Sequence, residues 1–271
     1  MLHNKKNVQL LLLGSRRRER KHSLSQTMNT TLVVGASGAT GRLLVEQLLE
    51  GGERVRAIVR SAGSLAELSA KHAGLAVIEA SVLELSDAQL GQHVRGCRAV
   101  ASCLGHSLSF GGIFGQPRRL VTDATRRLCE AIKAADPGDS GAPVKFVLMN
   151  TTGNSNRDLD EPISFAQSCV IGLLRLLLPP HVDNEQAADW LRTRIGQADP
   201  LIEWVAVRPD GLIDEERVCA YDVHPSPTRS AIFDAGSTSR INVGHFMREL
   251  IRDEATWERW KGQMPVLYNR A

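Results

Sequence analysis

The stretch spanning residues 33–60, "VVGASGATGRLLVEQLLEGGERVRAIVR", constrains the fold more than any other part of the chain. Its glycines at 35, 38 and 41 stand between a β-branched run and an amphipathic helix, and a second apolar run follows. The first turn of a helix has unpaired N–H groups and a partial positive charge, and a phosphate reaches it where no side chain intervenes. In such a unit Gly35 would permit the turn, Gly38 the close approach and Gly41 the helix–sheet packing. The stretch therefore predicts a site for a phosphate-rich dinucleotide.

The end of the second apolar run, 54–60, indicates which dinucleotide fits. A site for NAD usually carries Asp or Glu there, where the carboxylate binds the ribose 2′-hydroxyl. This chain has Arg60 followed by Ser61, and a guanidinium suits a 2′-phosphate through paired hydrogen bonds. NADP(H) is therefore favoured over NAD(H), unless Arg60 is an ordinary surface arginine. Ser37 and Thr40, in the glycine turn, could add hydroxyl contacts.

Strand patterns and helix patterns alternate along the rest of the chain. Expected strands cover 31–36, 54–60, 75–82, 98–105, 144–152 and 202–212, and expected helices cover 39–52, 64–74, 86–96 and 120–135. A short strand leading into a helix is expected at 239–253. This order predicts βαβ units in a doubly wound, mostly parallel α/β sheet with helices on both faces. The 42% apolar content, with only 4% aromatic residues, suits the aliphatic core of such a sheet.

One Rossmann domain is expected over 28–271, with a small substrate-side region near its C-terminal end. The segment at about 154–189 departs from the alternating pattern. It contains a hydrophobic helix that should end at Pro179–Pro180, because proline cannot continue a helix. An insertion or lid beside the cleft and a further core helix are equally good interpretations of this segment.

Residues 1–27 differ in charge from the rest of the chain. They carry a net charge of +6 in a chain of +3, so the remainder is mildly acidic and the basic pI gives no support for nucleic-acid binding. This leader is interpreted as disordered or as lying before a true start at Met28, with organelle targeting as the alternative. Its apolar run is far shorter than the roughly 20 residues that span a bilayer. Membrane association is not expected. The protein is expected to be a cytoplasmic monomer or homodimer.

The five cysteines are scattered and contain no CxxC pair, which argues against a disulfide framework or a zinc site. No histidine, cysteine or aspartate cluster has metal-ligand spacing, so no metal is expected. A G-x-S-x-G nucleophile elbow is also absent from the sequence.

The glycine unit, "VRAIVR", "AVASCLG", "FVLMNTT" and "WVAVRPDGL" follow one another in an order that resembles atypical short-chain dehydrogenases. The similarity covers about residues 30–255 and is greatest to the branch with NmrA-like, flavin-reductase and biliverdin-reductase-B-like members. It implies a Rossmann fold that binds NADP(H). The residues that would hold the adenosine and phosphate half, by their motif positions, are Gly35, Ser37, Gly38, Ala39, Thr40, Gly41, Arg60 and Ser61. Leu104 and Gly105 would lie near the ribose and the nicotinamide.

The chain departs from better-known relatives at the proton relay. Those relatives use a Tyr-x-x-x-Lys pair, in which the lysine lowers the tyrosine pKa so that it exchanges a proton with the substrate. Neither Tyr221 nor Tyr268 has a lysine four residues later, and Pro180 and Asn184 stand at the matching positions. Chemistry in this chain must therefore proceed without that relay.

The weak candidates for catalysis are Thr151, His106 and His181. Thr151 and Asn150 lie where relatives place a serine that contacts the substrate or the nicotinamide amide. The two histidines are the candidates of a residue type that exchanges protons, although a surface or capping role is the more common one for each. Hydride transfer to a flavin-like or quinone-like acceptor needs little protein acid, because solvent supplies the proton.

Two further residues are weak candidates for substrate binding. Asp210 follows Arg208-Pro209 at the carboxyl edge of the expected sheet. Arg229 lies in the expected loop 221–233 and offers a cation to an anionic substrate, unless this is only a structured surface loop. The segment 257–265, with two of the chain's four tryptophans, is expected to pack a helix end and tail on the body.

Three functions remain open. The first is an NADP(H)-dependent oxidoreductase acting on a small carbonyl, quinone or flavin-like molecule. The second is a non-enzymatic NADP(H) sensor that binds a protein partner, which the absent Tyr-Lys pair favours. The third is docking to a membrane or a protein assembly through the apolar stretch "VIGLLRLLLPP".

Overall fold

A mostly parallel sheet forms the centre of the molecule in the computed structural model, which describes residues 30–106, 115–135, 141–161 and 164–270. Its strands are β1 (Thr30–Val34), β2 (Arg54–Val59), β3 (Leu75–Glu79), β4 (Ala99–Ser102), β5 (Val144–Met149), β6 (Ile202–Pro209), β8 (Tyr221–His224) and β10 (Val266–Asn269). Their spatial order is β3-β2-β1-β4-β5-β6-β10-β8, and β8 pairs antiparallel with β10. The expected leader, 1–27, lies outside the described residues.

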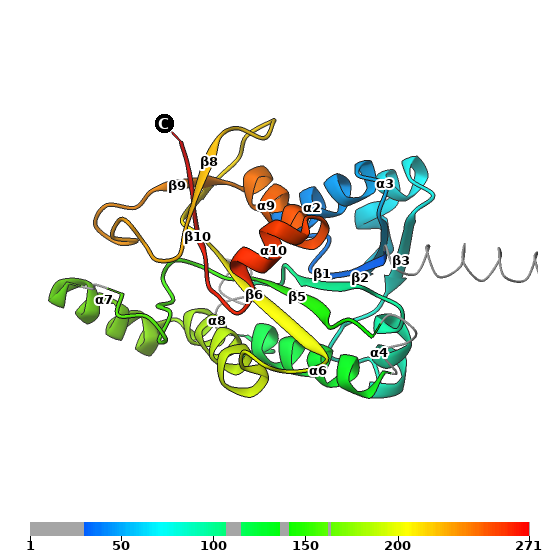
Figure 1. Cartoon of the computed structure of the whole chain (residues 1–271), viewed down its shortest axis with the longest axis horizontal. Coiled ribbons are helices and arrows are strands. Elements are labelled where there is room, and N and C mark those ends of the chain that lie inside the picture. The colour runs from blue at the N-terminus through cyan, green and yellow to red at the C-terminus, as the bar shows by residue number, and fades with distance from the viewer. Residues whose placement is uncertain (1–29, 107–114, 136–140, 162–163, 271) are drawn as a thin grey trace, which may run out of the picture.

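Helices cover both faces of this sheet (Figure 1). One face carries α2 (Ala39–Glu50), α3 (Ala66–Lys71), α9 (Arg240–Arg252) and α10 (Glu254–Trp260). The other carries α4 (Asp87–Val94), α6 (Leu120–Ala134) and α8 (Pro179–Trp190), which runs on into η3 (Leu191–Ile195). A short turn of helix, η1 (Ala62–Leu65), follows β2. The doubly wound arrangement predicted from the sequence is confirmed.

The core is aliphatic and lies in two layers, because successive strand residues point to opposite faces. Leu32 and Val34 of β1 pack toward α4 and α6, whereas Val33 packs toward α2 and α9. Each layer also holds a large aromatic side chain, Trp204 in the first and Trp257 in the second, both almost completely buried. The predicted packing role of the C-terminal tryptophans is confirmed.

The C-terminal part of the sheet differs from the prediction. The stretch expected to be a loop begins with a strand, β8, and the chain end forms β10, which inserts between β6 and β8. The single strand expected at 202–212 ends at Pro209, and β7 (Gly211–Ile213) leaves the sheet to pair with β9 (Ser237–Ser239). These short strands lie outside the regular alternation of strand and helix patterns that located the equally short β4, so the sequence did not indicate them.

The hydrophobic segment 165–177 forms α7 (Phe165–Leu177), which projects from the body at the lower left of Figure 1. Its interpretation as a core helix is wrong, because Ile171 is its buried residue while Phe165 and Leu176 are 86% and 80% exposed. The helix ends before Pro179, as predicted. Within the described residues no single helix is long and apolar enough to cross a membrane; the pair Phe165–Leu177 and Pro179–Ile195 is bent by 104°.

Candidate functional site

The turn between β1 and α2 depends on its glycines. Gly35 has φ +74°, and a Cβ there would lie 2.5 Å from the Cys103 carbonyl carbon, so β1 and β4 approach each other closely. A Cβ on Gly41 would overlap the Gly35 carbonyl oxygen. The N–H of Gly38 donates to that same oxygen at 3.0 Å. Side chains at these positions would displace the backbone of the turn.

The N-terminus of α2 is open. Gly38 is its N-cap and provides no side-chain hydrogen bond, and the first turn holds no acidic residue. Ser37, Gly38 and Ala39 are exposed, while Thr40 is buried. The first N–H groups of a helix have no intrahelical acceptor and carry the positive end of its dipole. The expected phosphate site therefore has exposed backbone donors, whereas the Thr40 side chain is buried.

Arg60 stands at the carboxyl end of β2 with an exposed side chain. Within the described residues its guanidinium forms no hydrogen bond or ion pair. The neighbouring turn is fixed from α2, where Arg42 donates to the Ser64 carbonyl at 3.3 Å and to the Glu67 carboxylate at 3.0 Å. Ser61 is exposed and is the N-cap of η1. Arg60 is thus free to meet an anion beside the α2 terminus.

Sequence reasoning missed an acid at this position. Glu79 ends β3 in register with Val59, and its carboxylate accepts the Ala62 N–H at 2.7 Å. The one available signal was its place at the end of the third strand. Its carboxylate already has a backbone partner, which makes it a poorer match to a ribose hydroxyl than a free acid on β2.

The end of β4 lies against the glycine turn. Leu104 is half-buried, Gly105 is exposed, and a Cβ on Gly105 would meet open space. Burial raises the pKa of the Cys103 thiol to about 12. This thiol therefore stays protonated near neutral pH and is a poor nucleophile.

The end of β5 is joined to the first turns of α8. Asn150 Nδ2 donates to the Asn184 carbonyl at 3.0 Å, and Asn184 Nδ2 donates to the Pro180 carbonyl at 3.1 Å. Asn150 Oδ1 accepts from the Thr151 N–H and from Asn154 Nδ2. The Asn150 side chain is therefore fully used in joining the end of β5 to α8. The half-buried Thr151 hydroxyl is the polar group more available to a ligand.

The structure places the two candidate histidines on different sides of α8. His106 Nε2 lies 2.8 Å from Asp183 Oδ2, and Asp183 also accepts the backbone N–H groups of Val121 and Thr122 at the start of α6. His106 is thus the buried partner of Asp183, the residue that caps α6.

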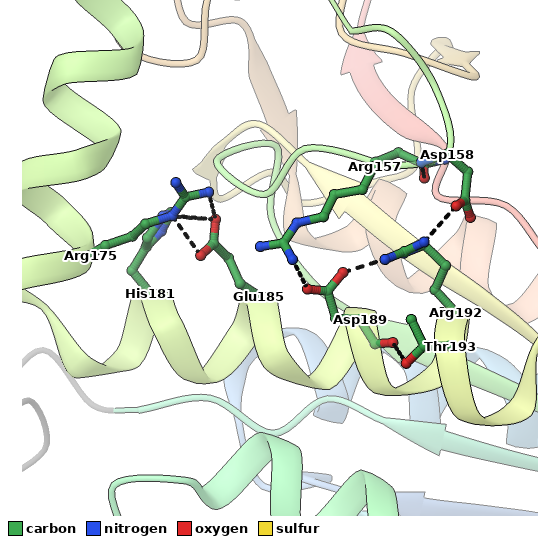
Figure 2. Close-up of polar contacts among 9 residues, drawn as sticks. Arg157, Asp158, Arg175, His181, Glu185, Asp189, Arg192 and Thr193 are labelled. Carbon is green, nitrogen blue, oxygen red and sulfur yellow. Dashed lines mark hydrogen bonds and ion pairs between the residues drawn. The ribbon is translucent and has the colours of Figure 1, made fainter.

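His181 instead lies beside the end of β5. A Cβ built on Gly153 would be 3.4 Å from His181 Cε1, 3.7 Å from its Nδ1 and 3.8 Å from Thr151 Oγ1. Figure 2 shows the imidazole grouped with Glu185 of α8 and Arg175 of α7. Burial lowers the pKa of His181, Glu185 raises it, and Arg175 lowers it, with a net decrease. No sequence pattern indicated this three-residue cluster, because its members come together only through the packing of α7 on α8.

The two weak substrate candidates have partners of their own. The buried Asp210 carboxylate accepts from Thr152 Oγ1 at 3.1 Å and from the N–H groups of Gly211 and Gly236 at 3.0 and 2.8 Å. Arg229 forms an exposed ion pair with Asp234. The geometry gives Asp210 a bracing role between β5, β6 and β9, and leaves Arg229 on an exposed loop.

Arg208 is a buried residue that holds segments near the site together, and the sequence analysis assigned it no role. Its guanidinium is 0% exposed and forms a bidentate ion pair with Glu161, at 3.0 and 2.6 Å. It also donates to the carbonyls of Asn154 and Met264. One side chain thus joins β6, the segment before α7 and the C-terminal tail.

A family model described as NAD(P)H-binding matches residues 35–254. The chain belongs to this NAD(P)H-binding family. The predicted resemblance to NAD(P)-binding Rossmann proteins is thereby confirmed, and the match begins at the first glycine of the turn. No curated relative matches the sequence.

Solved structures share the fold of this NAD(P)H-binding protein. A candidate NAD-dependent epimerase/dehydratase from Bacillus halodurans has a TM-score of 0.65 at 21% identity, covering 89% of this chain and 94% of its own. The anaerobilin reductase ChuY from Escherichia coli O157:H7 has a TM-score of 0.60 at 18% identity, covering 89% and 97%. A candidate NADH-flavin reductase from Streptococcus pneumoniae has 0.59 at 17%, covering 89% and 99%.

The residues at the carboxyl edge fit a dinucleotide. The glycines let the turn pack closely on itself and on the end of β4, where added Cβ atoms would clash, and the exposed α2 terminus offers donors to a pyrophosphate. The switch point of this sheet lies between β1 and β4, where ligands of doubly wound folds bind. The nicotinamide end would then point toward Leu104, Gly105 and Thr151.

Proposed function

We propose that this NAD(P)H-binding protein is an NADP(H)-dependent oxidoreductase that acts on a small carbonyl, quinone or flavin-like molecule. The observation that carries the cofactor preference is Arg60, exposed and unpaired among the described residues at the end of β2. A guanidinium there binds a 2′-phosphate by charge-assisted hydrogen bonds and gives a 2′-hydroxyl no comparable partner.

The reaction type follows from the same edge of the sheet. A bound nicotinamide nucleotide supplies or accepts a hydride. The Thr151 hydroxyl lies at the end of β5, where it can orient an acceptor oxygen, and no Tyr-Lys pair stands on the adjoining helix. The names of two structural neighbours, an anaerobilin reductase and a candidate NADH-flavin reductase, support a reductase.

The test is a fluorescence titration of the full chain with NADPH and with NADH. We expect NADPH to bind more tightly, and Arg60→Ala to weaken NADPH binding about tenfold while leaving NADH binding nearly unchanged. The matched control is Arg194→Ala, because Arg194 is exposed on η3 at the opposite edge of the sheet. Equal binding of both nucleotides would contradict the cofactor preference, and binding of neither would contradict the oxidoreductase.

A second candidate function is a nucleotide-responsive regulator that binds a protein partner. It is favoured by α7, whose residues Leu173, Leu176 and Leu177 are exposed by more than half. An apolar surface of this kind marks interaction sites in soluble proteins. NADPH oxidation with a panel of quinones, flavins and aldehydes separates the two functions, since a regulator would bind NADPH without turnover.

A further inference from the structure

We infer that His181 is the proton donor of this site and that Glu185, held by Arg175, positions its imidazole. The assignment rests on the proposed oxidoreductase function. His181 would then be the acid that replaces the absent Tyr-Lys pair. It lies in the first turn of α8, beside the end of β5.

The position of His181 is fixed by the joint between β5 and α8. The bond from Asn150 Nδ2 to the Asn184 carbonyl, at 3.0 Å, holds the first turns of α8 against the strand end. The His181 side chain, 10% exposed, then lies beside Gly153 and Thr151. Its Cε1–Nδ1 edge and the Thr151 hydroxyl are both within 4 Å of the point where a Gly153 Cβ would stand. An acceptor oxygen held by Thr151 is therefore within reach of the imidazole.

The other edge of the imidazole faces an acid. His181 Nε2 is buried, has no hydrogen-bond partner among the described residues, and lies 3.6 Å from Glu185 Oε1. That separation is too long for a hydrogen bond but close enough for strong charge interaction. Glu185 therefore stabilises the protonated ring without consuming its proton.

Arg175 determines how strongly the Glu185 carboxylate stabilises the protonated His181 ring. Its Nε lies 3.1 and 2.9 Å from the two carboxylate oxygens of Glu185, and its second guanidinium nitrogen lies 2.7 Å from Oε1 (Figure 2). This pair also connects α7 to α8. The charged groups facing His181 are thus Glu185 from α8 and Arg175 from α7. The β5 end offers only a hydroxyl and backbone, and Asp183 points to the opposite side of α8, toward α6.

The proton balance is simple. The acceptor carbonyl would gain at its carbon the hydride that NADPH loses on oxidation to NADP⁺, and at its oxygen a proton from His181; the N–H bond of the imidazolium breaks as the O–H bond forms. Solvent then returns a proton to the ring. Because burial lowers the pKa of His181, the acid form is a strong donor, and turnover should fall as pH rises through this pKa.

The experiment measures NADPH oxidation by the full chain with p-nitrobenzaldehyde and with 9,10-phenanthrenequinone across pH. We expect His181→Asn to lower kcat for the aldehyde by about 100-fold or more. The quinone should be affected much less, because its reduced anion is stable without immediate protonation. The matched control is His93→Asn. Burial and Arg56 lower the pKa of His93 as well, but it lies on α4 at the opposite edge of the sheet.

Substitutions of Arg175 and of Glu185 should shift the pH profile of turnover in opposite directions. Arg175→Met removes a cation and should move the aldehyde pH profile to higher pH, whereas Glu185→Gln removes the anion and should move it to lower pH. NMR titration of the His181 Cε1–H signal in the nucleotide-free chain, identified by its absence in His181→Asn, should show the same two shifts. A merely structural role for the pair would shift neither the profile nor the signal.

The outcomes separate the two ideas. A wild-type chain that reduces both probes while His181→Asn matches it, with NADPH affinity unchanged, overturns the proton-donor assignment alone. Profiles and NMR signals that stay fixed in both Arg175→Met and Glu185→Gln overturn the positioning role. A wild-type chain that binds NADPH but reduces neither probe overturns the oxidoreductase function together with this assignment.

Discussion

The proposed nucleotide side and the proposed acceptor side of the site are built in different ways. The nucleotide side is one continuous stretch, β1–α2–β2, whose proposed binding groups are backbone donors of the α2 terminus and one exposed arginine. The acceptor side draws on the end of β5, α7, α8, β6 and the C-terminal tail, and its groups are side chains held by buried polar bonds. The nucleotide side is thus formed by residues that are close in the sequence. The acceptor side forms only when segments distant in the sequence pack together.

This difference has a physical origin. A pyrophosphate is recognised by N–H groups that every residue carries, so the sequence needs only glycines to admit it. An acceptor is recognised by particular side chains, which must be fixed in position by others. On the acceptor side that support centres on the fully buried Arg208 and its partner Glu161.

The largest expected effect comes from breaking that support. Arg208→Met leaves Glu161 buried without its cation, and we expect the free energy of unfolding to fall by about 3–5 kcal/mol. Urea unfolding measures it. The matched control is Arg229→Met, which removes an exposed ion pair and should change stability little. Below the unfolding midpoint, NADPH should still bind to Arg208→Met; loss of that binding in the folded protein would mean that the two sides are not separate.

An intermediate effect is expected on the nucleotide side. A Cβ at residue 41 overlaps the Gly35 carbonyl oxygen, so Gly41→Ala should lower the free energy of unfolding by about 1–3 kcal/mol. NADPH affinity should drop at least about tenfold, because the turn that presents the α2 terminus must shift. The control is Gly91→Ala on α4, where an added Cβ meets open space and helix propensity favours alanine. Unchanged affinity in Gly41→Ala would show that the turn is only a scaffold.

The smallest effect is expected on α7. Leu176 is 80% exposed, so Leu176→Ser should change the free energy of unfolding by less than about 0.5 kcal/mol. Ile171→Val, at the buried position of the same helix, should cost about 0.5–1.5 kcal/mol. Thermal unfolding of the two variants compares them directly. A large loss in Leu176→Ser would show that this face of α7 is covered in solution, which would favour the partner-binding function.

The accuracy of the sequence predictions follows the same division. The strands β1 to β6 were predicted because apolar runs alternate there with helix patterns, and this alternation locates even the four-residue β4. The strands β8 and β10 were missed, since they lie outside that alternation and their pairing joins positions more than 40 residues apart. The placement of His181 against Thr151, and of Arg175 against Glu185, likewise depends on contacts between separate elements.

By itself the sequence determined the doubly wound sheet, the glycine turn and the arginine at the end of the second strand. Each depends on neighbours within a few residues, through strand and helix periodicity and through the space that a missing Cβ leaves. Only the tertiary structure decided that His106 pairs with Asp183, the cap of α6, that Asp210 joins the segments around β7 to the end of β5, and that His181 meets the end of β5. The role of such a side chain is set by its partners, and those partners come from segments that folding alone brings together.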